Sequence, residues 1–366
     1  MQVELVVLVI AALAAAVSAY SWWGVRRARA GRSDIVSYAA APPPNSGTQR
    51  VALVLNPVKL HAALTREQVE QACADSGWEP PLILETTVED PGFGQASRAL
   101  EEGYDVVLAA GGDGTVRAVA QTLAHSSASL GLVPLGTGNL LARNLGIAVN
   151  DIPRSIRQAL HGSGRRIDMG RISLLNERTG VSSQHAFLVV GGIGLDATVV
   201  AATRDSLKEK FGWLAYSEAG VRHLPGRRQR VSISLDDRPA QSRKVRSVLF
   251  ANCAKLPGGI ELIPDSTIDD GYLDVVVMSP RSVLGWLWMA GKIVFRQRRP
   301  IPVLTYYRAR KVTVTVLEPT ETQIDGDLSG AVTTVSVEVD PGALMVRVLG
   351  ETTGPSAGLF SHSAES

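Results

Sequence analysis

The sequence predicts an α/β domain with a Rossmann-like parallel sheet, followed by an antiparallel β-sandwich domain. Three observations predict this fold class. From Val51 onward, short apolar runs alternate with segments of helical spacing, which is typical of parallel strands joined by helices. Two of these runs end in glycine-rich turns, and parallel sheets hold ligands at the carboxyl ends of their strands. After Gly164 the pattern changes to short alternating segments separated by turn residues, which favours a sandwich.

The expected elements follow in chain order. In the first domain they are a strand over Val51–Leu55, a helix over Thr65–Ser76, a strand over Pro81–Glu85, a helix over Pro91–Gly103 and a strand over Asp105–Ala110. In the second domain the expected strands are Ile167–Ile172, His185–Val190, Arg230–Leu235, Arg246–Asn252, Leu273–Met278, Lys311–Leu317 and Thr333–Val339. A chain of 366 residues exceeds what a single core usually fills, so two domains are expected.

The two glycine-rich turns are Gly111-Gly-Asp-Gly-Thr115 and Gly136-Thr-Gly-Asn139. Glycine lets the backbone approach a ligand closely, and the free N–H groups of a following helix attract an anion, so these turns predict a phosphate site. A tight turn without a ligand is the alternative for either motif, and two of them within one αβ repeat favour phosphate. Neither turn is a Walker loop, and neither has the spacing Gly-x-Gly-x-x-Gly.

Asp113 stands at the centre of the first turn. A carboxylate between glycines at a phosphate-binding edge needs a cation or a proton to offset its charge. We therefore expect Asp113 to take part in nucleotide binding and catalysis, with Mg²⁺ or a protonated acid balancing its charge.

From about Val51 to about Leu349 the chain resembles the lipid kinase family of diacylglycerol, sphingoid-base and ceramide kinases, which shares its Gly-Gly-Asp-Gly-Thr turn with NAD kinases. The resemblance implies ATP bound by the α/β domain and an active site between the two domains. It assigns nucleotide contacts to Asn56, Pro57, Lys59, Thr86 or Thr87, Gly111, Gly112, Asp113, Gly114, Thr115, Gly136, Thr137, Gly138 and Asn139.

In the nucleotide domain, four residues depart from the pattern of this family. The family usually has Asn-Pro-x-Ser-Gly after its first strand, where this chain has Lys59 and Leu60, so Lys59 is either a phosphate ligand or a solvated loop residue. Ala118 and Leu140 stand where the family commonly has Glu and Asp. These two losses bear on ribose or network contacts more than on the phosphate turns.

Two acidic segments complete the expected site. In Ile268-Asp-Asp-Gly-Tyr-Leu-Asp274, the resemblance implies a Mg²⁺ held by Asp270 with oxygens of Thr267 and Tyr272 and linked through waters to Asp113. A hairpin turn is the alternative, and both roles can hold together. Near the end of the chain, Asp327 stands where the family has a glutamate, and the resemblance implies that this residue is the general base for the acceptor hydroxyl. Aspartate has the same chemistry on a side chain one methylene shorter.

Charge and cysteine content narrow the function classes. Lys+Arg 37 against Asp+Glu 35 leaves almost no net charge, which removes bulk electrostatics as a sign of nucleic-acid binding. Basic residues cluster at Arg26–Arg32, Arg222–Arg230 and Arg296–Lys311, which suits a solvated face or an anionic membrane surface. Cys73 and Cys253 lack metal-binding spacing and predict buried, reduced thiols.

Leu5–Val25 carries no charged residue, and as a helix it would be about 30 Å long, the thickness of a hydrocarbon core. Trp22 and Trp23 at its end, followed at once by arginines, predict a single-pass transmembrane helix with the kinase domain on the cytoplasmic side of the cell membrane. A cleaved signal peptide and a buried core helix are weaker alternatives. The predicted layout is an anchor at 1–25, a basic and Pro-rich linker at 26–50, the nucleotide domain at 51–160, a lipid-substrate sandwich at 161–350 and a disordered tail at 351–366.

The expected function is an ATP- and Mg²⁺-dependent lipid kinase that phosphorylates a lipid hydroxyl, of diacylglycerol or of a sphingoid-type lipid. An NAD kinase-like enzyme and a catalytically inactive lipid- or nucleotide-binding protein are the alternatives; Ala118, Leu140 and Asp327 motivate the second. The oligomeric state stays open, a homodimer included.

Overall fold

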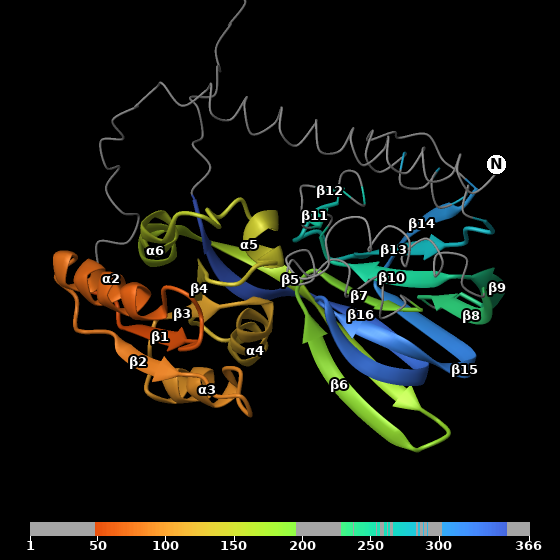
Figure 1. Cartoon of the computed structure of the whole chain (residues 1–366), viewed down its shortest axis with the longest axis horizontal. Coiled ribbons are helices and arrows are strands. Elements are labelled where there is room, and N and C mark those ends of the chain that lie inside the picture. Colours follow the sequence, from red (N-terminus) through yellow and green to blue (C-terminus); the bar gives the residue numbers. More distant parts are fainter. Residues whose placement is uncertain are drawn as a thin grey trace, which may run out of the picture.

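The computed structural model describes residues 48–194, 228–236, 238–253, 255–256, 260–261, 263, 266–282, 285, 288, 291 and 302–349. Their strands form one sheet of 14 strands and a separate two-stranded sheet. Figure 1 shows helices α2 to α6 gathered around one end of the large sheet, while strands β6 to β10 and β13 to β15 make up its other end.

The first domain is a parallel sheet, as the sequence predicts, and the structure shows its strand order to be β2-β1-β3-β4. Strand β1 has the predicted bounds, whereas α2 begins at Ala62 rather than Thr65. The elements are β1 (Val51–Leu55), α2 (Ala62–Asp75), β2 (Leu82–Glu85), α3 (Phe93–Glu101), β3 (Val106–Gly111), α4 (Asp113–Leu123), β4 (Ser129–Pro134), α5 (Leu140–Asn144) and α6 (Ile152–His161).

Both faces of this parallel sheet are covered by helices. Val51 and Leu53 of β1 pack with side chains of α2 and α6, while the alternate residues Ala52 and Val54 pack with those of α3 and α4. Strands buried on both faces are apolar without interruption, which explains the run Val51–Leu55. The polar groups of this domain are therefore displaced to the turns at the strand ends.

The second domain is antiparallel, as predicted, around a core of its own. Its strands are β5 (Ser163–Asn176), β6 (Val181–Phe187), β7 (Val190–Ile193), β8 (Gln229–Leu235), β9 (Gln241–Val245), β10 (Ser247–Ala251), β11 (Lys255–Leu256), β12 (Ile260–Glu261), β13 (Leu273–Met278), β14 (Leu304–Ala309), β15 (Lys311–Ile324) and β16 (Asp327–Val348).

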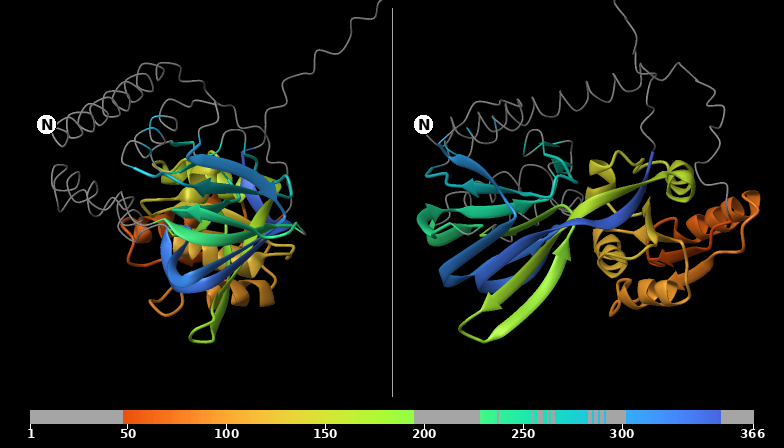
Figure 2. Two further views of the ribbon diagram at one scale, coloured as in Figure 1. Left: turned by 90° about the vertical axis from the view of Figure 1, so that its right-hand side faces the viewer. Right: turned by 180° about the vertical axis from the view of Figure 1, so that it is seen from behind.

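Strands β15 and β16 are longer than predicted. Register shifts between Thr315 and Thr320 let the β15–β16 ladder continue past residues that we read as strand ends. The C-terminal part of β16 then pairs with β4 in parallel, at Val346 and Leu130. In the right-hand view of Figure 2, β5 and β16 run from the sandwich into the helix-covered end of the molecule.

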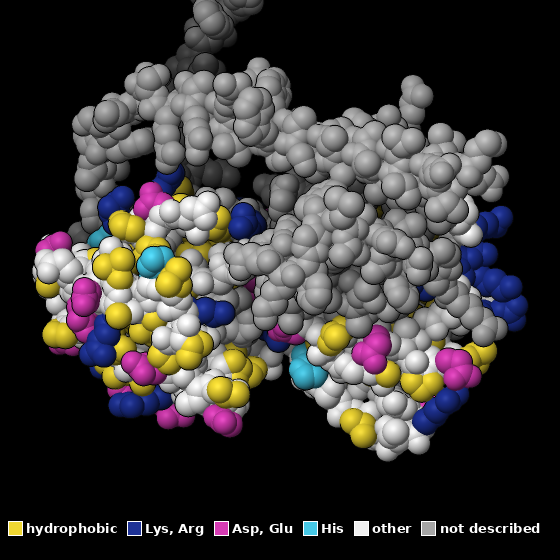
Figure 3. All heavy atoms as spheres, viewed as in Figure 1, with side chains coloured by type: hydrophobic (Ala, Val, Ile, Leu, Met, Phe, Trp, Pro, Cys, Tyr) yellow, Lys and Arg dark blue, Asp and Glu magenta, His cyan; other side chains and the backbone are white. Residues whose placement is uncertain are grey.

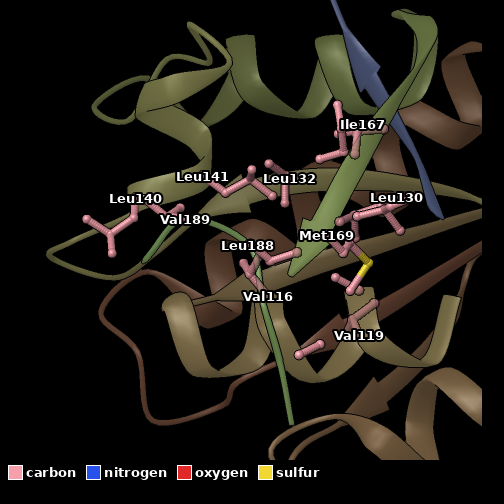
Figure 4. Close-up of a cluster of buried hydrophobic side chains, with 14 of the residues drawn as sticks. Val116, Val119, Leu130, Leu132, Leu140, Leu141, Ile167, Met169, Leu188 and Val189 are labelled. Carbon is pink, nitrogen blue, oxygen red and sulfur yellow. The ribbon is translucent and has the colours of Figure 1, made fainter. Parts of the chain in front are cut away.

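A shared apolar core joins the two domains. Met169 of β5 and Leu188, which follows β6, lie among Val116 of α4 and Leu130 and Leu132 of β4 (Figure 4). Because one sheet and one core run through both domains, turns of the sandwich are held in a defined position against α4. The boundary at 160/161 stays a prediction.

The predicted single-pass localisation in the cell membrane is corrected. Within the described part of the chain, no helix is long and apolar enough to span a bilayer. The longest of the named helices, α2, has 14 residues, and at the rise of an α-helix it reaches only about 21 Å of the roughly 30 Å required. The segment Leu5–Val25, the linker up to residue 47 and the tail at 351–366 lie outside the described residues.

Candidate active site

The two glycine-rich turns lie side by side. Strands β3 and β4 are neighbours, with Gly111 paired to Pro134, so their following turns leave the sheet together. The backbone N–H groups of Leu135 and Gly136 both donate to the Gly111 carbonyl, at 3.0 and 3.1 Å. A Cβ atom on Gly136 would lie 2.7 Å from Cα of Gly112, so a glycine is required for this close approach.

Asp113 joins the two turns. Its Oδ2 accepts the backbone N–H of Asn139 at 2.9 Å, and its Oδ1 accepts that of Leu140 at 2.6 Å. Burial raises the pKa of this carboxyl and the hydrogen bond from Leu140 lowers it, while the charges of Asp325 and Asp327 raise it further. A Cβ atom on Gly138 would come within 2.4 Å of Oδ2, so that glycine makes room for the carboxylate.

The loop after β1 places Lys59 over the first turn. The Asn56 N–H donates to the Ala110 carbonyl at 2.9 Å, and the Asn56 carbonyl accepts the Lys59 N–H at 3.2 Å, which folds the loop back toward β3. A Cβ atom on Gly112 would lie 3.8 Å from both Cε and Nζ of Lys59. The departure from the family pattern therefore brings a cation to the expected phosphate turn, while Pro57 itself is exposed.

The predicted threonine and asparagine contacts have different places. Thr115 is buried, with Oγ1 2.7 Å from where a Cβ atom on Gly111 would stand, so it packs beneath the turn. Thr86 is buried after the edge strand β2, and Thr137 is exposed in the second turn. Asn139 closes that turn, because its side chain accepts the Gly136 N–H and donates to the Gly136 carbonyl at 2.7 Å. Thr115 and Asn139 thus support the turns from below.

Asp327 of the sandwich lies against the same helix start. It is the first residue of β16, directly after the Asp325-Gly326 turn. Its Oδ2 is 3.9 Å from where a Cβ atom on Gly114 would stand, and 3.2 Å from a guanidinium nitrogen of Arg117. The structure therefore brings together the two predicted catalytic carboxylates, Asp113 and Asp327, from different domains.

The hairpin turn that carries Asp327 is anchored by Asp325. This buried carboxylate accepts the backbone N–H groups of Leu188, Val189 and Val190, each at 2.9 Å. Burial raises the pKa of Asp325, while these hydrogen bonds and the charge of Arg117 lower it. A left-handed φ of 47° at Asp325 and of 90° at Gly326 completes the tight turn.

Sequence reasoning missed three residues of this region. Arg117 is the only basic side chain of α4 and stands four residues after Asp113, on the same helix face, and that spacing was the available signal. Asp325 precedes Gly326 inside the segment that we singled out for Asp327 alone. Arg143 donates to the Gly138 carbonyl at 2.7 Å and so holds the second turn. Nothing in the sequence around Arg143 indicated this role.

The two losses from the family pattern, Ala118 and Leu140, are buried apolar side chains. Ala118 is 1% exposed and Leu140 is 7% exposed. Leu140 packs in the core that joins the domains, where Figure 4 shows it beside Val189. Both positions therefore contribute to packing where the family has acids.

The second acidic segment forms a separate loop. The buried carboxylate of Asp168, which the sequence analysis did not single out, holds this loop by accepting the Gly271 N–H at 2.6 Å, and it also accepts the Gly342 N–H at 2.7 Å. Within the loop, Asp270 accepts the Thr267 hydroxyl at 2.5 Å and the Tyr272 N–H at 3.0 Å. Among the described residues, the hydrogen bonds of Asp113 go to the second glycine-rich turn, and none joins it to this loop.

In this structure a guanidinium stands in the loop to which the resemblance assigns Mg²⁺, and the metal assignment stays a prediction. The donor atoms of the loop are oxygens, which suit Mg²⁺, but Asp270 is already ion-paired with Arg308. Arg308 also lies 3.8 Å from a carboxylate oxygen of Asp274. Within the described residues there is no group of three or more acidic, histidine or cysteine side chains arranged to hold a metal. The cation that contacts Asp270 in the loop of Thr267 and Tyr272 is thus the guanidinium of Arg308.

Fold and site together define a class of protein: an α/β domain with paired glycine-rich turns, joined to a β-sandwich that presents a carboxylate to them. Residues 45–172 match the family model of the diacylglycerol kinase catalytic domain, and residues 189–348 match that of the YegS C-terminal NAD kinase beta sandwich-like domain. The chain belongs to the diacylglycerol kinase type of lipid kinases and is a lipid kinase.

Individual relatives agree with these two matches. A diacylglycerol kinase of Bacillus subtilis (strain 168) is 29% identical over 292 residues, which are 77% of this chain and 91% of that protein. A diacylglycerol kinase of Staphylococcus aureus (strain bovine RF122 / ET3-1) is 27% identical over 289 residues, 77% of this chain and 87% of that protein. The crystal structure of a diacylglycerol kinase from Bacillus anthracis str. Sterne has the same fold, with a TM-score of 0.61 at 23% identity over 82% of this chain and 97% of that one.

Proposed function

We propose that this lipid kinase takes ATP with Mg²⁺ as its phosphoryl donor and transfers the γ-phosphoryl group to a lipid hydroxyl between the two domains. The observation that carries the proposal is the position of Asp327, whose carboxylate faces the first turn of α4 from the opposite domain. A base at the phosphate turn, rather than elsewhere on the sandwich, is what transfer to a bound acceptor requires.

In the proposed step, the hydroxyl oxygen of the lipid forms a bond to the γ-phosphorus and its proton passes to the Asp327 carboxylate. The bond from the γ-phosphorus to the bridging oxygen breaks, and its electron pair leaves with ADP. The free N–H groups at the start of α4 and the Lys59 ammonium, which lies next to Gly112, would hold the phosphates. Mg²⁺ bound to the nucleotide would neutralise charge on the phosphates.

We propose diacylglycerol as the acceptor class, because the relatives that cover most of this chain carry that name. A sphingoid-type lipid is the competing acceptor, since it shares an apolar body and a hydroxyl group. An NAD kinase activity would instead phosphorylate a nucleotide, and an inactive protein would phosphorylate nothing.

The experiment that tests the function is transfer of label from γ-labelled ATP, with and without Mg²⁺, into a total lipid extract, followed by identification of the labelled lipid. We expect one labelled diacylglycerol product that requires the divalent ion. Label in NAD added to a parallel reaction, or label in no acceptor, would overturn the proposal. Labelling of a sphingoid base would keep the reaction and change the acceptor.

We further propose an anionic membrane surface as the partner that delivers the lipid. Lys and Arg side chains gather over β8, β9 and β14 (Figure 3), and Arg230 and Lys244 are exposed and directly opposite each other across β8 and β9. Like charges in that position repel, and an anionic surface would relieve the repulsion.

We predict that the protein sediments with vesicles that contain anionic lipid and is released by salt, because salt screens attraction between exposed charges. The double change Arg230→Gln and Lys244→Gln should weaken sedimentation, and Arg66→Gln on α2 serves as the control. Sedimentation of the double variant with anionic vesicles at the level of the unchanged protein, or equal sedimentation of the unchanged protein with anionic and neutral vesicles, would overturn the membrane-surface proposal.

A further inference from the structure

Arg117 connects the two halves of the proposed site. It lies at the start of the second turn of α4, directly after Thr115 and Val116, and its side chain is 21% exposed. One guanidinium nitrogen donates to the backbone carbonyl of Ile324 at 2.8 Å, and the other donates to Oδ2 of Asp327 at 3.2 Å. The first bond fixes the position of the hairpin backbone, and the second fixes the orientation of the carboxylate.

The charges around Arg117 come from both domains. Asp327 and the buried Asp325 reach it from the β15–β16 turn, and its charge also acts on His185 of β6. Asp113, at the start of the same helix, experiences the charges of Asp325 and Asp327. Among the described residues, Arg117 is the arginine that bonds into this group of carboxylates, so its removal would change both the geometry and the charge balance.

The hairpin turn is held from two sides. On the sandwich side, Asp325 binds three backbone N–H groups, which fix the turn to the segment Leu188–Val190. On the side of the nucleotide domain, Arg117 is the bonded contact that reaches both the turn and Asp327. An aspartate has one carbon–carbon bond less than a glutamate, about 1.5 Å of reach, so its carboxylate depends more strongly on where the backbone is held.

We propose that Arg117 is a positioning residue for phosphoryl transfer: by holding the Ile324 carbonyl and the Asp327 carboxylate against the first turn of α4, it sets the reach of the short base. This inference rests on the proposed function. A displacement of about 1 Å at a reacting group is enough to lower a rate 10²-fold, so the effect belongs in kcat rather than in the affinity for ATP.

The test combines variants at Arg117 and Asp327 in the full chain, with steady-state kinetics on γ-labelled ATP and dispersed diacylglycerol. Arg117→Gln should lower kcat by about 10–10²-fold with little change in the KM for ATP. It should also shift the pH profile of kcat, because it removes the charge that lowers the pKa of the neighbouring Asp325 and His185. Arg117→Lys keeps the charge but not the two-pronged geometry, so its activity should be intermediate.

Two combinations separate positioning from general stability. In the Asp327→Asn background, Arg117→Gln should cost little further activity, because the group that Arg117 positions is already gone. In the Arg117→Gln background, Asp327→Glu should restore part of kcat, because the longer side chain regains reach. Arg66→Gln, which breaks an exposed pair with Glu70 on α2, is the matched control and should change neither kcat nor the pH profile.

The outcomes distinguish the two proposals. If the unchanged protein labels no lipid, the proposed function fails and the inference falls with it. If the unchanged protein labels lipid, the inference alone is overturned by either of two results: Arg117→Gln keeps the unchanged kcat and pH profile, or its loss of activity adds fully to that of Asp327→Asn and is not relieved by Asp327→Glu. A lower melting temperature of Arg117→Gln without a change in kcat would assign Arg117 a purely structural role.

Discussion

At the scale of single residues, three carboxylates of the site have different environments. Both carboxylate oxygens of Asp113 accept hydrogen bonds from backbone N–H groups of the second turn. Both oxygens of Asp325 accept hydrogen bonds from the segment after β6. Asp327, whose side chain is 44% exposed, faces Gly114 and Arg117 instead. Burial and bonding therefore assign the first two to shaping the site and leave the third with access to an acceptor.

We predict that Asp113→Asn lowers turnover by a factor on the order of 10² or more while the fold stays intact. Asparagine presents one acceptor oxygen to the two N–H groups of Asn139 and Leu140, and its own N–H₂ group opposes the other donor. Label transfer measures the loss, and circular dichroism checks the fold. Asp75→Asn, at an exposed position of α2, is the control; full activity of Asp113→Asn would refute its assignment.

Asp325→Asn should lower the free energy of unfolding by about 1–3 kcal/mol, because one buried N–H group loses its acceptor. The deficit should depend on pH. Burial raises the pKa of Asp325, so the folded state keeps its proton to a higher pH than the unfolded state does. The contribution of Asp325 to the free energy of unfolding is therefore lost as the pH rises above the ordinary pKa of an aspartate. The Asp325→Asn variant has no titratable group at this position and shows no such loss.

Urea unfolding across that pH window measures both curves. The difference in unfolding free energy between the unchanged protein and Asp325→Asn should shrink as the pH rises. A difference that grows with pH would mean that the three N–H groups lower the pKa of Asp325 more than burial raises it.

At the scale of elements, the sequence located strands better than their ends. The run Val51–Leu55 became β1 without change because a strand covered on both faces must be apolar throughout. The ends of β15 and β16 could not be predicted, because bulges near Thr315 and Thr320 let these strands continue through turn-forming residues. Such bulges depend on pairing with a distant strand rather than on local sequence.

The loop between Ser266 and Leu273 carries an element-scale prediction. Arg308 of β14 is the cation of this loop, so Arg308→Gln should lower the melting temperature by roughly 2–4 °C and leave Asp270 and Asp274 to repel each other. Millimolar Mg²⁺ or Ca²⁺ should then raise the melting temperature of the variant more than that of the unchanged protein.

Scanning calorimetry with and without the divalent ion measures this difference. Arg165→Gln is the matched control, because Arg165 pairs with the neighbouring Asp269 in the same loop. If divalent ions raise the melting temperature of the unchanged protein as much as that of Arg308→Gln, the loop holds a metal despite Arg308.

At the scale of the whole molecule, β5 and β16 run through both domains, and one apolar core lies beneath them. The phosphate turns and the β15–β16 turn therefore belong to a single continuous structure. These turns meet at Gly114, Arg117 and Asp327, so a structural change in one domain alters the position of site residues in the other.

Asp327 tests this contact between domains. We predict that Asp327→Asn lowers transfer by about 10²–10⁴-fold while ATP still binds, and that Asp327→Glu keeps or raises activity because it restores the longer side chain of the family. Label transfer and calorimetric titration with ATP measure the two effects separately. Turnover of Asp327→Asn equal to that of the unchanged protein would place the base elsewhere.

By itself, the sequence determined the fold class, the two glycine-rich turns and the kinase family, because periodic apolar runs and glycine turns are local patterns that the chain carries wherever it folds. Only the tertiary structure decided which distant groups meet: Lys59 with Gly112, Asp113 with the second turn, and Arg117 with Asp327. It also placed Arg308 on Asp270. Contacts between residues far apart in the chain depend on how sheets and domains pack, and no local spacing encodes that.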